Sequence, residues 1–175
     1  MIPFTRTATG SYAAGFTHVE TEIIADLAAQ IAGMLSPLVG SDDPLFAAVG
    51  IGGTSLLNDD PAIARLLPDA YGDDAAASGD FRRLTEQSLA TRKVANARAV
   101  IDSLERTGES LELSEQEAQS WLRTLSDIRL TIAARLGIES DGDEGATGSD
   151  SALALHDLYD WLAYVTESLL DALDD

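Results

Sequence analysis

The 175-residue sequence contains no cysteine, which excludes disulfides, thiolate nucleophiles and cysteine-ligated metal sites. Histidine is almost absent as well, because His18 and His156 are the only two. A histidine-based metal site would need both of them in one place. The G-x-S-x-G motif that presents a nucleophilic serine does not occur. These absences predict a protein that is not an enzyme and that needs neither a metal nor a cofactor.

Positive charge is also scarce. The chain has 11 basic residues against 30 acidic ones, so its net charge is -19. Residues 136–175 contain eleven acids and no base. Because a polyanion gains nothing by approaching another polyanion, this composition disfavours direct binding to nucleic acid or to an anionic membrane. It is compatible with a solvated, repulsive surface, with a basic protein partner, or with mimicry of nucleic acid.

Long apolar runs are missing too. No segment approaches the roughly 18 consecutive apolar residues of a membrane span, and the N-terminus lacks the basic-then-apolar pattern of a signal peptide. We therefore expect a soluble cytoplasmic protein. The length suits one domain over residues 1–175, and a chain of this size can bury about 70% of its unfolded surface.

The clearest element is a helix from Ser114 to Ile138. Ser114 and Glu117 have the spacing of a capping box, and Gly137 suits the left-handed residue that ends a helix. Apolar residues recur at three- and four-residue steps, as on the buried face of a helix. They are Ala118, Trp121, Leu122, Leu125, Ile128, Ile132 and Leu136.

The other segments predict a mainly α fold, a helical bundle with a small β-hairpin packed on it. The hairpin is expected within residues 1–19 and pairs Phe4–Thr7 with Tyr12–His18. Thr17 and Glu20 can form a second capping box. Apolar periodicity and proline positions predict further helices over 20–38, from Pro61, over 79–106 and over 151–173.

Two glycine-rich stretches favour loops. The Gly50–Ser55 stretch lacks the lysine and the spacing of a phosphate-binding loop. Residues 139–150 are acidic and are expected to form a mobile loop. They resemble a calcium loop in composition alone, because Ala146 stands where that loop requires glycine.

Two cations fall on apolar helix faces. Arg129 lies inside the buried face of the 114–138 helix, and Lys93, the only lysine, lies inside the apolar stripe of the 79–106 helix. Each can be explained by snorkelling or by an internal ion pair. If the two helices pack together, Arg129 and Lys93 could instead share a carboxylate or form an anion-binding site to which neighbouring Arg92 contributes.

Aromatic residues on the last helix define a candidate interface. Trp161 lies at the edge of the buried stripe, and Tyr164 lies on the opposite side with Asp157, Asp160 and Asp171. Tyrosine and tryptophan are enriched at the centres of protein interfaces. A single exposed tyrosine also occurs on surfaces that bind nothing.

Seven short motifs occur in a distinctive order over residues 60–172: RLLPDAY at 65–71, FRRLTE at 81–86, the Arg92–Lys93 pair, Trp121–Leu122, SDIRL ending at Leu130, ARLGI ending at Ile138, and the closing YDWLAYVTESL. In order and spacing they resemble an actinobacterial family catalogued as domain of unknown function 2017. Members are sometimes labelled transcriptional regulators and are often encoded beside the Clp protease adaptor. The resemblance therefore implies a regulatory role and a partner related to the Clp system. It supplies no catalytic residues.

The sequence thus leads to one main hypothesis and two alternatives. The main hypothesis is a non-catalytic helical module that acts through a protein partner or as a homodimer. The first alternative is a small-anion sensor that uses Arg129 and Lys93. The second is the transcription-associated regulator that the family label implies, although the chain shows no basic recognition helix.

Overall fold

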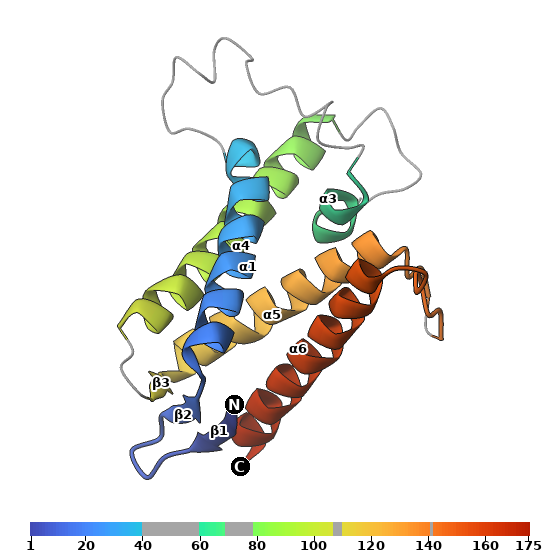
Figure 1. Cartoon of the computed structure of the whole chain (residues 1–175). Coiled ribbons are helices and arrows are strands. Elements are labelled where there is room, and N and C mark those ends of the chain that lie inside the picture. Colours follow the sequence, from blue (N-terminus) through green and yellow to red (C-terminus); the bar gives the residue numbers. More distant parts are fainter. Residues whose placement is uncertain (40–59, 69–78, 107–109, 141) are drawn as a thin grey trace.

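The computed structural model describes residues 1–39, 60–68, 79–106, 110–140 and 142–175 (Figure 1). The elements in chain order are β1 (Ile2–Arg6), β2 (Tyr12–Gly15), α1 (His18–Leu35), the short 3-10 helix η1 (Ser36–Leu38), α3 (Pro61–Leu66), α4 (Gly79–Glu105), β3 (Leu111–Leu113), α5 (Glu115–Leu136) and α6 (Asp150–Asp174). The mainly α fold with an N-terminal hairpin is confirmed. The Gly50–Ser55 stretch lies outside the described residues.

Helix α5 is the central element, because it packs against α3, α4 and α6 and also touches α1 (Figure 1). Its capping box forms as predicted. The Ser114 backbone N–H donates to the Glu117 carboxylate at 2.9 Å, and the Glu117 N–H donates to the Ser114 hydroxyl at 3.3 Å. Gly137 follows with φ of 72°, a conformation that costs other residues strain. Local sequence therefore fixes both ends of this helix.

The hairpin forms, and it belongs to a larger sheet. β1 and β2 pair antiparallel as predicted, but β2 ends at Gly15 and does not reach His18. The reason is the capping box of Thr17 and Glu20, which makes His18 the first residue of α1. The unpredicted strand β3 pairs antiparallel with β2 and completes a three-stranded sheet in the order β1-β2-β3.

An aromatic cluster joins this sheet to the helices. The Trp121 ring is fully buried, and its centroid lies 5.8 Å from that of Phe4 and 5.9 Å from that of Phe16. The indole Nε1–H of Trp121 donates to the hydroxyl of Ser103 on α4 at 2.9 Å. The cluster thus connects α5 with α4 and with the sheet, and it satisfies the polar end of the buried indole.

The helix predicted over 20–38 instead begins at His18 and stops at Leu35, and Pro37 lies in η1. Proline has no backbone N–H with which to continue the α-helical hydrogen bonds. Helix α6 is capped by the Ser149 hydroxyl. It lies along α5 and reaches the sheet near both chain termini (Figure 1). Among the described residues, no helix has both the length and the apolar character that crossing a membrane requires.

Candidate functional site

An ion pair between a half-buried lysine and a buried aspartate links α4 to α5. The Nζ of Lys93 donates to Oδ1 of Asp127 at 2.5 Å. Asp127 is 3% exposed, and its second oxygen, Oδ2, is buried with no hydrogen-bond partner in the described part of the chain. Burial raises the pKa of the Asp127 carboxyl above its usual value, although the ion pair with Lys93 acts in the opposite direction. The structure therefore keeps a carboxylate where desolvation disfavours its charge.

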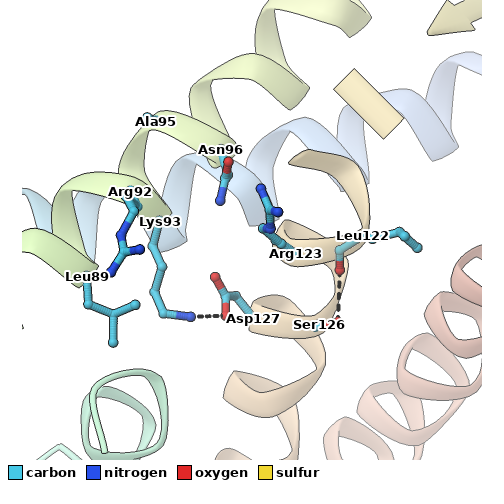
Figure 2. Close-up of a pocket in the computed structure, with 9 residues that line it drawn as sticks. All are labelled: Leu89, Arg92, Lys93, Ala95, Asn96, Leu122, Arg123, Ser126 and Asp127. Atoms are coloured by element: carbon cyan, nitrogen blue, oxygen red, sulfur yellow. Dashed lines mark hydrogen bonds and ion pairs between the residues drawn. The ribbon is translucent and has the colours of Figure 1, made fainter. Parts of the chain in front are cut away.

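This ion pair lies in a groove of about 590 Å³ between the two helices (Figure 2). We call it the α4–α5 groove, and its lining residues are Leu89, Arg92, Lys93, Ala95, Asn96, Leu122, Arg123, Ser126 and Asp127. Figure 2 shows Arg92, Lys93 and Asn96 from α4 on one side and Arg123 and Asp127 from α5 on the other. Three cations therefore meet one acid in a chain whose net charge is -19.

The two arginines of the groove have no acidic partner within the described residues. Neither Arg92 nor Arg123 takes part in an ion pair there. Among the described residues, the one hydrogen bond of Arg92 runs from Nε to the backbone oxygen of Ser88 at 3.4 Å. Both guanidinium groups therefore have donors to offer to a bound molecule.

Arg129 does not join this groove. Positions 127 and 129 differ by about 200° around a helix of 3.6 residues per turn, so the two side chains leave α5 on different sides. The Cζ of Arg129 lies 4.6 Å from the centroid of the Tyr159 ring on α6, the geometry of a cation–π contact. Its Nε is buried and has no hydrogen-bond partner among the residues that the structure describes. Lys93 and Arg129 therefore share no carboxylate, and Arg92 is the predicted residue that lies with Lys93.

The outer side of α6 carries the second candidate site. Six exposed residues recur there at three- and four-residue steps, and we call them the α6 stripe: Leu153, Asp157, Asp160, Tyr164, Glu167 and Asp171. Tyr164 is 47% exposed. Trp161 is half-buried and packs against the core, so the two aromatic residues of the predicted interface have different surroundings, and Tyr164 is the one that faces solvent.

The carboxylates of the α6 stripe are not neutralised within the described part of the chain. None of its four acids takes part in an ion pair there. The stripe also lies in the segment 136–175, which contains no basic residue. It is therefore a row of free negative charge around an exposed tyrosine.

The remaining predicted candidates have local roles. Nε2 of His18 lies 3.4 Å from the Glu22 carboxylate on α1, and Nε2 of His156 lies 3.1 Å from the Ala146 carbonyl oxygen. In the acidic segment expected to be mobile, Asp143 accepts hydrogen bonds from two backbone N–H groups, which lower its pKa. No three potential metal ligands come together within the described ranges.

Sequence reasoning did not single out Asp127, Arg123 or Asn96, although all three line the groove. A signal for Asp127 exists in the sequence. It continues a run of polar residues at helical spacing that includes Ser120 and Thr124, and the structure buries all three. Small polar residues that recur on one helix face, next to an apolar face, can indicate a helix that packs against other elements on both faces.

Comparisons with known proteins lead to the same family that the sequence motifs resemble. The family model described as "Domain of unknown function (DUF2017)" matches residues 1–173. Proteins named "Oxidative stress regulator AosR" from Mycobacterium tuberculosis and Mycobacterium bovis are each 29% identical over 167 residues, which cover 86% of this chain and 77% of theirs. An AosR protein of Mycobacterium leprae is 28% identical over 170 residues, with 88% of this chain and 78% of the relative covered. No solved structure matches the chain.

Proposed function

This chain belongs to the DUF2017 family, and we propose that it is a regulatory protein that acts without catalysis, by binding a basic segment of another protein along the α6 stripe. The names of its relatives support a regulatory role. The observation that carries the proposal is the row of unpaired carboxylates around the exposed ring of Tyr164.

The geometry of the stripe suits an elongated partner. From Leu153 to Asp171 it follows the helix for about 27 Å, at 1.5 Å of rise per residue. Asp157 and Asp160 precede Tyr164, and Glu167 and Asp171 follow it. Complementary charge speeds encounter and selects the partner, while a buried aromatic anchor supplies much of the affinity. The partner is therefore expected to present lysines or arginines around a small apolar pocket that receives Tyr164.

A second copy of this chain fits the stripe poorly. In a two-fold symmetric dimer the same surface faces itself, so two rows of carboxylates would lie against each other. Like charges placed together across an interface cost several kcal/mol, on the order of the binding free energy that one anchor residue supplies. We therefore assign the stripe to a different protein of opposite charge. Binding to a basic DNA-binding protein would also accommodate the transcriptional label of the family without direct contact to DNA.

The test is cross-linking from a defined position in the intact chain. A photoreactive benzoyl-phenylalanine replaces Tyr164, and in a matched control it replaces Arg98, an exposed residue on α4. After irradiation in host cells, we expect the Tyr164 position to give one dominant adduct with a basic protein, and the Arg98 position to give none. A component of Clp proteolysis in that adduct would also fulfil the expectation from the family resemblance.

Charge variants then decide whether the stripe itself is the binding surface. Asp157→Lys with Asp160→Lys reverses two charges three residues apart on α6. Asp102→Lys with Glu105→Lys makes the same change of net charge, at the same spacing, on α4. The α6 pair should abolish the adduct and the α4 pair should preserve it. Equal adducts from both pairs, or no adduct at Tyr164, would refute the proposal.

A further inference from the structure

We propose that the α4–α5 groove binds a small metabolite that carries a phosphate group. This binding site is separate from the α6 stripe, because none of the residues that line the groove belongs to α6. The inference therefore stands on its own observations, and its test does not depend on the protein partner.

The first observation is the charge of the groove. Acids outnumber bases by 30 to 11 in this chain, so a groove in which cations outnumber acids departs from its overall charge. Arg92 and Arg123 make no ion pair among the described residues, while their side chains border the same space (Figure 2). Together with Lys93 and Asp127 they give the groove a formal charge of about +2 when the arginines and Lys93 are protonated. Such a local excess favours an anionic ligand.

The second observation is the chemistry of the cations. Arginine presents a planar fork of N–H donors that matches two oxygens of a phosphate, and two arginines can share one phosphate from different sides. The ammonium group of Lys93 is held in place by Oδ1 of Asp127. It has two further N–H donors, and Lys93 lines the groove, so a ligand there meets an ammonium group that is already held in place. Pre-orientation lowers the entropy lost on binding.

The third observation concerns the rest of the ligand. A groove of about 590 Å³ is much larger than a phosphate ion and lies in the range typical of small-molecule sites. Leu89, Ala95 and Leu122 provide apolar wall, and the amide of Asn96 provides a donor and an acceptor. These features select an organic phosphate over inorganic phosphate.

The experiment is a titration of the full chain, followed by NMR of its backbone amides and arginine Nε–H groups. The probes are glucose 6-phosphate, AMP and inorganic phosphate, with glucose as the uncharged control and ionic strength held constant. We expect glucose 6-phosphate or AMP to give saturable shifts at Asn96, Arg123 and Ser126, with weaker binding of inorganic phosphate and none of glucose.

Three single variants make the titration specific. Arg92→Gln and Arg123→Gln each remove one guanidinium group from the groove, and Arg98→Gln removes one from an exposed position on α4 that does not line it. Loss of a charge-assisted hydrogen bond should weaken the organic phosphate about tenfold in each groove variant and leave the Arg98 variant unchanged. Thermal unfolding of each variant verifies that the fold is intact.

Three results would overturn the proposal. One is the absence of saturable shifts with every phosphate probe at about 10 mM, a concentration that detects even millimolar affinity. Another is an equal loss of affinity for the organic phosphate in the Arg98 variant, which would show that the effect comes from net charge alone. The third is inorganic phosphate binding as tightly as both organic phosphates. Each of these leaves the cross-linking result at Tyr164 unaffected, so the two proposals fail separately.

Discussion

Replacing Lys93 by methionine removes the cation that is bonded to Asp127 and leaves a carboxyl group that is 3% exposed without its counter-charge. A buried charge that loses its partner costs about 3–5 kcal/mol. The carboxyl can avoid this cost by binding a proton. Each pH unit above an unfolded-state pKa of about 3.9 makes protonation about 1.4 kcal/mol more expensive. At pH 7 the cost of the neutral form is therefore about 4 kcal/mol.

The native protein already bears part of this cost, because burial raises the pKa of Asp127 even with Lys93 in place. We therefore expect Lys93→Met to lower the free energy of unfolding at pH 7 by about 2–3 kcal/mol, less than the full penalty. A group whose pKa is raised by folding contributes most stability below its unfolded pKa, and loses it as the pH rises through the folded pKa. The deficit of the variant should shrink to below about 1.5 kcal/mol at pH 5, where protonation is cheap.

Urea unfolding followed by far-UV circular dichroism measures the free energy of unfolding of the native chain and the variant at pH 7, 6 and 5. All three values lie above the isoelectric point of about 4.1. The control is the double variant Lys93→Met with Asp127→Asn, which removes the titrating group while keeping its shape. It should recover most of the lost stability at pH 7 and show little dependence on pH. A deficit of the same size at all three pH values, or one that persists in the double variant, would refute this reasoning.

Three further changes test how the fold is held together. Ser103→Ala leaves the buried indole N–H of Trp121 without an acceptor and should lower the free energy of unfolding by about 1–3 kcal/mol in urea titrations; a loss near zero would contradict the role of this bond. Ser114→Ala removes the N-cap of α5 and should cost about 1 kcal/mol by thermal unfolding, whereas an unchanged melting temperature would show that the cap contributes nothing. Gly137→Ala forces a φ of 72° on a residue with a Cβ and should destabilise by about 1 kcal/mol. Its matched control is Gly33→Ala in α1, where a Cβ meets nothing within 4 Å. There the same change should stabilise the fold by about 0.5–1 kcal/mol. A change in the free energy of unfolding with the same sign at both positions would contradict the role given to the φ of Gly137.

The helices could be predicted because their signals are local. Both capping boxes join residues three apart, and the buried stripes recur within single helices, so no knowledge of neighbours is needed. Strand β3 has no such signal. It consists of Leu111–Leu113, and it becomes a strand because β2, about a hundred residues earlier in the chain, offers its edge. A three-residue alternation is too short to indicate a strand without its partner.

The candidate site could be predicted less well than the helices, because it depends on contacts between distant elements. The sequence places Lys93 and Arg129 on apolar faces, but the partner of each cation depends on which helix covers that face. Lys93 finds Asp127 across the α4–α5 contact, and Arg129 finds the ring of Tyr159 across the α5–α6 contact. Both partners are fixed by helix packing, which periodicity alone does not determine.

The composition limits which residues of this chain could be oxidised reversibly. The relatives are named for oxidative stress, and reversible oxidation of proteins begins chiefly at cysteine thiolates and, less often, at methionine. These 175 residues contain no cysteine and two methionines, of which Met34 is partly buried against the core. An oxidative signal therefore cannot begin at a thiol of this chain. Under the two proposals above, regulation instead arrives through another molecule: a basic protein at the α6 stripe and an organic phosphate at the α4–α5 groove.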